Sequence, residues 1–196
     1  MKTKKGEKEK RRTVILDKAI AYLKRHGRVG SGTDQIMNYA GLTRGALYSH
    51  FESKEDLFAQ AVCYDLARLE DTLARRFRED GSAALRSLIS EHLSEKSLRE
   101  VENSCAFTSL SSDMQRSKPE HRALYEEYML RIYAMFADAL KERFPQDSPE
   151  ENLAKATNLY SGLVGTLTMA RTMKDPNRAR QILKSGKEFL TRTFAP

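Results

Sequence analysis

Apolar residues recur at three- and four-residue spacing along most of the chain, and no stretch alternates convincingly with a period of two. The first such stretch contains Ile15, Leu16, Ala19, Ile20 and Leu23. This spacing predicts an amphipathic helix over residues 9–26, because side chains three and four positions apart share one helix face. Gly27 follows as a helix stop. Residues 1–8 precede the pattern and are expected to form a flexible basic arm.

The same spacing, combined with capping residues and prolines, predicts helices along the rest of the chain. They are expected over 33–40, 43–49, 53–77, 83–93, 119–144, 149–173 and from 176 on, with short helices inside 94–117. Ser53, Ser148-Pro149 and Asp175-Pro176 each mark a helix start. The predicted fold is all-α with roughly nine helices. The composition changes near residues 50–60, so a domain over 9–56 and another over 57–196 are expected.

The excess of positive over negative charge is concentrated in the first third of the chain. Residues 1–60 carry 13 Lys and Arg against 7 Asp and Glu, whereas residues 61–196 carry 21 against 20. This asymmetry favours one domain that faces a polyanion and a second that is nearly neutral. Two cysteines do not make a disulfide framework, and neither a signal peptide nor a membrane-spanning run is evident. A cytoplasmic protein is therefore expected.

Residues 33–51 carry the pattern of two short helices separated by a tight turn. Helices this short are stable only when they pack on each other and on a third helix. The apolar residues that supply a shared face are Ile36, Ala40, Leu42, Leu47 and Phe51. Gly41 can adopt the left-handed conformation that ends the first helix. The outward face of the second helix comprises Thr43, Arg44, Gly45, Ala46, Tyr48 and Ser49. Such short, polar side chains suit insertion into the major groove of DNA.

The region from Arg12 to Phe58 resembles the TetR family of bacterial one-component repressors. The resemblance lies in the Ile15-Leu16 helix that ends at His26-Gly27, in Thr33-x-x-Ile36, and in Ala40-Gly41-Leu42-Thr43-x-Gly45-x-Leu47-Tyr48-x-His50-Phe51-x-Ser53-Lys54-Glu55-x-Leu57. It covers about a quarter of the 196 residues, and Met37 stands where the family more often has Ala. It implies a homodimer with a three-helix helix-turn-helix domain. It also implies a second domain of six or so helices for dimerisation and ligand binding, with repression of a palindromic operator that a small molecule relieves.

The resemblance also implies roles for individual residues. Phosphate contacts are expected from Thr33, Tyr48, His50 and Lys54, and groove contacts from Thr43, Gly45, Ala46 and Ser49. Arg44 is expected to read a base edge, because its side chain can donate two bonds to guanine. Alternatives remain open: Tyr48 could be a packing residue, His50 could simply end its helix, and Arg44 could be a solvated charge. The basic arm could add backbone or minor-groove contacts, or serve solubility alone.

The second domain shows neither a catalytic nor a metal-binding signature. The four histidines are scattered, and no glycine-rich phosphate loop is evident, so a non-enzymatic protein without cofactor or metal is expected. Ser161, Gly162 and Gly165 lie within one helix, and the resemblance places the dimer interface on the last two helices. Packing of a glycine within the monomer is the alternative.

An effector pocket would be lined by aromatic or flexible residues of the second domain. The candidates are Phe107, Met114, Tyr125, Tyr128, Met129, Tyr133, Tyr160 and Met169, together with Cys105. An aromatic and methionine stripe also fits a plain core. Cys105 could sense oxidants or electrophiles, or be a small buried residue.

Two further classes of function compete with a ligand-released repressor. One is an enzyme with an appended helical domain, for which no nucleophile-base pairing is found. The other is a regulator that responds to a protein contact instead of a ligand. The sequence leaves the operator, the effector and the sign of regulation open.

Overall fold

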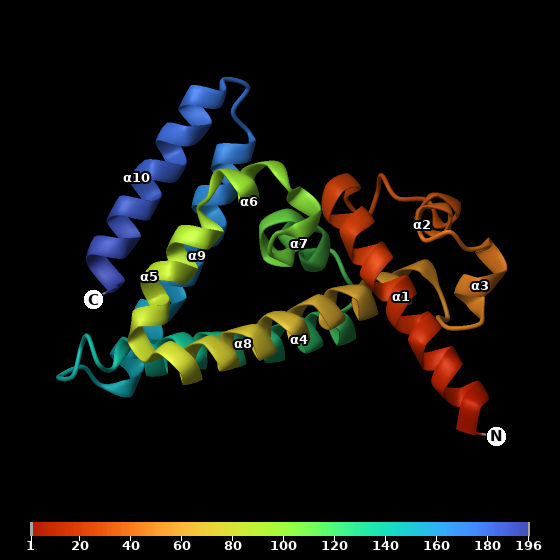
Figure 1. Cartoon of the computed structure of the whole chain (residues 1–196), viewed down its shortest axis with the longest axis horizontal. Helices are drawn as coiled ribbons and strands as arrows, with labels where there is room; N and C mark the ends of the chain where they lie inside the picture. The colour runs from red at the N-terminus through yellow and green to blue at the C-terminus, as the bar shows by residue number, and fades with distance from the viewer. Residues whose placement is uncertain (1, 196) are drawn as a thin grey trace. The chain divides into compact units, whose positions relative to one another are not determined.

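The computed structural model describes residues 2–195 of the chain, with side chains from residue 6 onward. Over these residues it contains ten α-helices, two short 3₁₀ helices and no strand (Figure 1). The expected all-α fold is confirmed. The helices are α1 Lys2–His26, α2 Thr33–Tyr39, α3 Arg44–Tyr48, α4 Lys54–Asp80, η1 Gly81–Ala83, α5 Ala84–His92, α6 Glu95–Arg99, η2 Val101–Asn103, α7 Ala106–Gln115, α8 Pro119–Leu140, α9 Pro149–Arg171 and α10 Pro176–Phe194.

The first helix begins earlier than the apolar pattern predicts. Residues 2–8, expected to form a flexible arm, belong to α1, so that prediction is wrong for them. Met1 lies outside the described residues. Helix growth adds one hydrogen bond per residue once a nucleus exists, and the Lys- and Glu-rich segment before Arg11 has good helix propensity apart from Gly6. The buried face around Ile15 therefore serves as a nucleus that the basic segment extends.

The helices form two compact units. The first comprises the residues up to Ala67 together with Val101–Tyr125, and the second comprises Arg68–Glu100 together with the residues from Glu126 on. Thus η2 and α7, which come after the second unit's α5 and α6 in sequence, pack with the N-terminal helices. The functional boundary expected after residue 56 stays a prediction.

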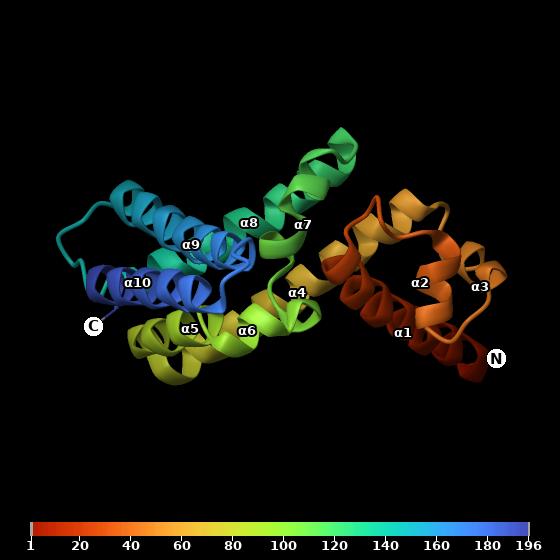
Figure 2. The same cartoon turned by 90° about the horizontal axis from the view of Figure 1, so that it is seen from above.

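Within the first unit, α2 packs on α1 and on α3 (Figure 2). The five apolar residues expected on the inner face of α1 are each at most 3% exposed. Gly27 has φ +69° and Gly41 has φ +70°, so both occupy the left-handed region expected at these helix ends. Leu47, the anchor of α3, is fully buried, and Ile36 of α2 is 1% exposed.

The start of α4 is fixed by a reciprocal capping arrangement. The Asp56 amide donates to Ser53 Oγ at 3.0 Å, and the Glu52 amide donates to Asp56 Oδ2 at 2.9 Å. Two amides at the helix start are thereby satisfied. The expected N-cap at Ser53 is confirmed, and α4 begins directly after the helix-turn-helix segment.

In the second unit, α9 and α10 run side by side in both cartoon views (Figures 1 and 2). Ser148 and Glu151 form the expected capping box at the start of α9, and Asp175 caps α10. The two backbones approach closely at Gly186, where a Cβ would lie 2.4 Å from Thr166 Cγ2. Glycine is therefore required there by the packing of α10 on α9.

A histidine with a buried ring nitrogen lies at the end of α5. His92 interacts with the Leu163 backbone of α9, while its Nε2 is buried without a hydrogen-bond partner among the described residues. Desolvation, followed by the nearby charge of Arg171, lowers the pKa of His92 to about 4. The imidazole is accordingly neutral at physiological pH.

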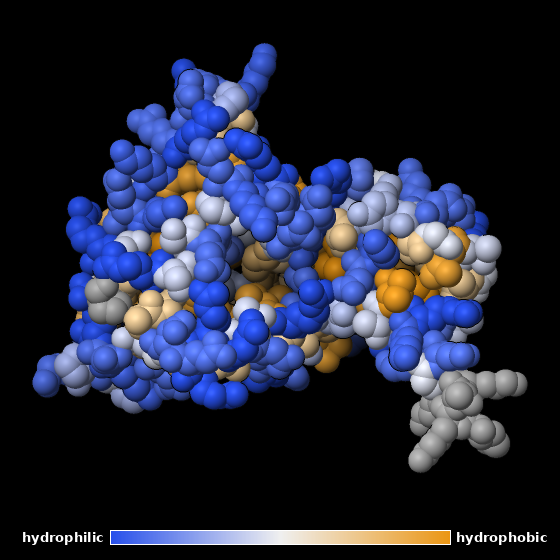
Figure 3. Space-filling view, viewed as in Figure 1, coloured by the Kyte–Doolittle hydropathy of each residue, from blue (hydrophilic) through white to orange (hydrophobic). Residues whose placement is uncertain are grey.

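The visible surface is mostly hydrophilic, with small apolar patches between the charged side chains (Figure 3). Val14 and Val29 are among the exposed apolar residues of the first unit, and Leu153, Met169 and Phe189 are among those of the second. None of the helices among the described residues is long and apolar enough to cross a bilayer.

Candidate nucleic-acid interface

The five-residue helix α3 has a polar face that is largely exposed to solvent. Leu47 points into the core, whereas Thr43, Arg44, Gly45, Tyr48 and Ser49 are exposed and Ala46 is half-buried. Tyr48 is 53% exposed, which excludes the alternative that it is a packing residue. Thr43 occupies the N-cap position, although its hydroxyl makes no capping bond. Leu47 is thus the one residue of α3 that packs in the core behind this exposed face.

Arg44 lies between two polar neighbours at the start of this helix. Its Nη1 lies 3.8 Å from Asp34 Oδ2, and the two side chains are 61% and 65% exposed. A hydrogen bond with Tyr48 and then the charge of Asp34 raise the pKa of Arg44 above its usual value. An exposed pair at this distance adds little to folding. The guanidinium can therefore exchange Asp34 for a base or phosphate at small cost.

Gly45 has no packing reason to be glycine. A Cβ built there would meet only Thr43 Oγ1, at 4.0 Å, and its backbone is not in the left-handed region. Alanine would favour the helix by up to about 1 kcal/mol. Glycine at an exposed helix position allows another molecule to approach the backbone closely.

His50 lies beside positive side chains contributed by α1. Desolvation lowers its pKa, and the charges of Lys8, Arg11 and Arg12 lower it further. Its Nδ1 is buried and has no hydrogen-bond partner within the described residues. The N-terminal part of α1 thus brings Lys8, Arg11 and Arg12 next to a residue of the helix-turn-helix segment. Lys8 lies in the segment expected to be an arm. Arg11 and Arg12 lie in the helix expected from residue 9, but the spacing of apolar residues does not show that they face His50.

A relay of polar side chains joins α1 to the start of α4. Arg12 donates to Gln60 Oε1, and Gln60 Nε2 donates to Asp56 Oδ1 at 2.6 Å. The Arg12 guanidinium also lies 5.7 Å from the centre of the Phe51 ring. The sequence shows only that Arg12 lies three residues before Ile15. This spacing does not indicate that its side chain contacts Gln60 and Phe51.

The other two predicted phosphate contacts lie at helix starts. Thr33 is the first residue of α2, and Lys54 is the first residue of α4. Both side chains are half-buried. Backbone amides at a helix start are not all used within the helix, and they favour a negatively charged ligand. The positions of Thr33 and Lys54 are therefore compatible with the predicted role.

The predicted effector residues divide between the two units. Cys105, Phe107, Met114 and Tyr125 belong to the first unit, and Tyr128, Met129, Tyr133, Tyr160 and Met169 belong to the second. Phe107, Met114, Tyr125 and Tyr160 are buried, Met169 is 55% exposed, and the others are half-buried. The rings of Tyr133 and Tyr160 meet edge to face at 5.7 Å, and Arg131 lies 4.4 Å from the centre of the Tyr128 ring. The contact between Tyr133 and Tyr160 agrees with the core alternative for these two rings.

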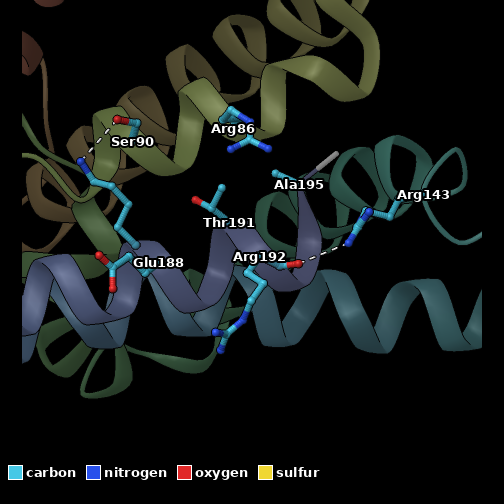
Figure 4. Close-up of a pocket in the computed structure, with 8 residues that line it drawn as sticks. Arg86, Ser90, Arg143, Glu188, Thr191, Arg192 and Ala195 are labelled. Atoms are coloured by element: carbon cyan, nitrogen blue, oxygen red, sulfur yellow. Dashed lines mark hydrogen bonds between the residues drawn. The ribbon is translucent and has the colours of Figure 1, made fainter.

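A basic groove of about 800 Å³ opens in the second unit beside α5 and α10 (Figure 4). Its lining residues are Arg86, Ser90, Arg143, Lys187, Glu188, Thr191, Arg192 and Ala195. Arg143 donates to the carbonyl oxygens of Arg192 and Thr193, at 3.2 and 3.4 Å. None of the predicted effector residues lines this groove. Among residues 2–195 no group of three His, Cys, Asp or Glu side chains is placed to hold a metal ion.

The three predicted interface residues on α9 differ in their surroundings. A Cβ at Gly162 would lie 2.9 Å from Leu190 Cδ2 of α10, so packing within the chain accounts for this glycine. Gly165 is exposed, and a Cβ there would meet nothing within 4 Å. Ser161 is exposed and hydrogen bonds with Tyr133.

A three-helix arrangement with this exposed polar face defines the class of helix-turn-helix transcriptional regulators. Residues 15–61 match the family described as bacterial regulatory proteins, tetR family. The likeness in sequence to this family of transcriptional regulators lies in the segment that contains the helix-turn-helix.

Two relatives in sequence match part of the chain. The regulator AcrR of Shigella flexneri is 32% identical over 88 residues, which cover 43% of this chain and 41% of AcrR. The probable acrEF/envCD operon repressor of Escherichia coli is 40% identical over 57 residues, 29% of this chain and 26% of that protein. The match therefore spans less than half of either relative.

Solved structures resemble nearly the whole chain. A TetR family regulator from Agrobacterium tumefaciens has a TM-score of 0.79 at 16% identity and covers 96% of this chain and 100% of its own. Reduced E. coli NemR has a TM-score of 0.78 at 17% identity, covering 93% of this chain and 96% of its own. FadR from Bacillus subtilis, solved with stearoyl-CoA, has a TM-score of 0.67 at 18% identity, covering 91% and 96%. At these identities the likeness establishes the fold.

Proposed function

We propose that the protein is a homodimeric transcriptional repressor that binds a palindromic DNA operator through α3 and leaves it when a small molecule binds. The observation that carries the proposal is the exposed face of α3, where Arg44 is only loosely paired and Gly45 is unexplained by packing. Residues 9–56 are the proposed DNA-binding domain, and residues 57–196 the effector-binding and dimerisation domain. A cytoplasmic, non-enzymatic role without cofactor or metal is part of the proposal.

The proposed DNA contacts fall into two groups. Arg44 reads a base edge, and Thr43, Gly45, Ala46 and Ser49 line the groove. Thr33, Tyr48, His50 and Lys54 contact phosphates, which fix the position of the protein without specifying sequence. The positive neighbourhood of His50 supports this division.

The proposed dimer forms through α9 and α10. Gly165 supports it, because the chain itself does not fill the space beside this residue. Met169 and Phe189, each 55% exposed, provide apolar area on the same two helices. Ser161 and Gly162 are included as neighbouring positions. A monomer in multi-angle light scattering at micromolar concentration would contradict the dimer.

The proposed effector is a small molecule of unidentified chemistry. The stearoyl-CoA bound to the FadR neighbour supports this, since that protein of the same fold holds a small molecule. The candidate residues are Cys105, Phe107, Met114, Tyr125, Tyr128, Met129, Tyr133 and Tyr160. A thermal-shift screen tests the effector, since a ligand that binds only the folded state raises its stability.

A second candidate is repression controlled by oxidation or alkylation of Cys105. This residue is half-buried at the N-cap of α7, where the helix dipole favours negative charge. The neighbour NemR was solved in a form named as reduced. If Cys105 is the sensor, an electrophile weakens DNA binding of the wild type and leaves Cys105→Ser unchanged.

The central experiment measures binding to the DNA upstream of the protein's own gene by fluorescence anisotropy. Arg44→Ala is expected to weaken binding by about 1–3 kcal/mol, roughly 5- to 150-fold, because one base contact is lost. Asp34→Asn is expected to tighten binding by removing a competing carboxylate. Arg99→Ala, which alters a 69% exposed arginine of α6 in the second unit, is the control. Absence of binding at low salt, with Arg44→Ala indistinguishable from wild type, would overturn the proposal.

A further inference from the structure

We propose that Asp113 and Glu102 are positioning residues for DNA binding: they hold the turn between α1 and α2 in the geometry that orients the helix-turn-helix. Both lie outside the proposed DNA-binding domain in sequence, yet both pack within the first unit. The inference rests on the proposed function and adds a fixed support for the exposed face of α3.

The contact of Asp113 is with the backbone of the turn. Asp113 is 7% exposed on α7, and its Oδ2 accepts a hydrogen bond from the Arg28 amide at 2.9 Å. Gly27, just before this amide, has φ +69°, a conformation that redirects the chain after α1. A Cβ at Gly27 would lie 3.5 Å from the same carboxylate oxygen. The carboxylate thus lies directly against the backbone of the turn.

The carboxylate is itself fixed on the α7 side. Asp113 Oδ1 accepts a hydrogen bond from Arg116 at 2.8 Å. A buried charge is costly unless it is paired and hydrogen bonded, and here both oxygens have a donor. Because hydrogen bonds to charged groups are stronger than neutral ones, Asp113 is a firm link between α7 and the turn.

A second link holds the last turn of α1. Arg25 Nη2 lies 2.9 Å from each carboxylate oxygen of Glu102, which belongs to the short helix η2. The Glu102 backbone amide and the Arg25 side chain lower the pKa of Glu102, so it is charged at neutral pH. One residue earlier, Lys24 Nζ lies 2.7 Å from Asp65 Oδ1 of α4. The end of α1 is therefore held by two different elements.

The turn matters for DNA binding because it leads directly into α2. Ser31, fully buried, donates its Oγ–H to the Gly27 carbonyl at 2.5 Å, and α2 begins at Thr33. Helices of seven and five residues have little stability of their own, so their orientation depends on the segments that anchor them. A change at Asp113 is expected to loosen α2 and α3 together while leaving the DNA-contacting side chains unaltered.

The test compares Asp113→Ala with Asp113→Asn. Alanine removes the acceptor, whereas asparagine keeps one oxygen for the Arg28 amide. We expect Asp113→Ala to weaken DNA binding about tenfold or more, measured by anisotropy well below the unfolding midpoint, and Asp113→Asn to restore most of the affinity. Asp138→Asn, which breaks an exposed ion pair with Lys141 in the second unit, is the control and should leave affinity unchanged.

Amide hydrogen exchange provides a readout that needs no DNA. In Asp113→Ala, the Arg28 amide and the amides of α2 should exchange faster, while those of α9 should not. If wild type binds no DNA fragment, the proposed function fails. Faster amide exchange in Asp113→Ala then remains the test of whether Asp113 holds the turn. If wild type binds DNA and folded Asp113→Ala binds equally well with unchanged exchange, the inference is overturned.

A second variant guards against misfolding of Asp113→Ala. Glu102→Gln alters a side chain that is 27% exposed beside Arg25, which is 56% exposed, so folding should be retained. It should weaken DNA binding about two- to fivefold, and combining it with Arg25→Gln should add nothing further. Additive losses in the double variant would contradict the link between these two residues.

Discussion

Helix α3 and the α9–α10 pair both carry glycines inside helices, but for different physical reasons. In the pair, Gly162 and Gly186 leave room for Leu190 and Thr166, so close packing within the chain accounts for them. In α3, Gly45 is exposed, and no group of the chain approaches the place of its missing Cβ closely. Since glycine weakens a helix relative to alanine, a glycine indicates an external partner only where the fold itself does not need it.

The largest expected effect is on the pH dependence of folding stability, and it comes from His92 in the second unit. Its pKa in the folded protein, about 4, lies below the usual 6.5, so the unfolded chain binds more protons between these values. The stabilising contribution is complete above pH 6.5 and is lost as pH falls toward 4, a change on the order of 3 kcal/mol. Urea unfolding at several pH values measures it.

His92→Asn is the matched variant for this measurement, because it removes the titrating group and keeps a side-chain donor. The pH dependence of stability between 6.5 and 4 should flatten in this variant. An unchanged pH profile would show that other groups determine the acid sensitivity of the second unit.

A smaller effect separates the two kinds of glycine directly. Gly186→Ala should destabilise the protein by about 1–3 kcal/mol, because the added methyl overlaps the stiff, β-branched Thr166. Gly165→Ala, on the neighbouring helix, should leave the stability of the monomer equal or raise it by up to about 1 kcal/mol. Thermal unfolding measures both. Equal destabilisation by Gly186→Ala and Gly165→Ala would contradict the distinction between packed and open glycines.

The smallest expected effect is on α3 itself. Gly45→Ala should raise the free energy of unfolding by up to about 1 kcal/mol and yet weaken DNA binding. The opposite signs of the two changes would set Gly45 apart from the packing glycines, which lose stability when altered. Parallel unfolding and anisotropy measurements test this. Unchanged DNA affinity would mean that no partner approaches the backbone at this position.

Local features are predictable from the sequence, and long-range contacts are not. The left-handed Gly27 and Gly41, the capping residues Ser53 and Ser148, and the apolar face around Ile15 depend on neighbours a few positions away. The contact between Arg28 and Asp113 joins residues 85 positions apart. No periodicity encodes such a pairing, because it depends on where distant segments of the first unit meet.

The same division between local and long-range features applies to the candidate DNA-binding face. The outward face of α3 is expected from helical spacing, and the structure confirms that Tyr48 and Arg44 are exposed. The basic face of α1 near His50 is not predictable in this way, because it depends on how the start of α1 packs against the helix-turn-helix segment. Lys8 lies, in addition, in a segment that resembles a flexible arm. The need for glycine at position 186 is equally hidden, since the sequence gives no sign of the threonine that it faces.

The single buried anchor of α3 has a consequence for redesign. Leu47 is the only fully buried residue of this helix, so Thr43, Arg44, Ala46 and Ser49 can be varied together without disturbing the side chain that ties it to the core. A library randomised at these four positions would sample new operator preferences on an unchanged scaffold. Recognition and folding thereby depend on separate residues of one short helix, which makes the DNA-facing surface exchangeable.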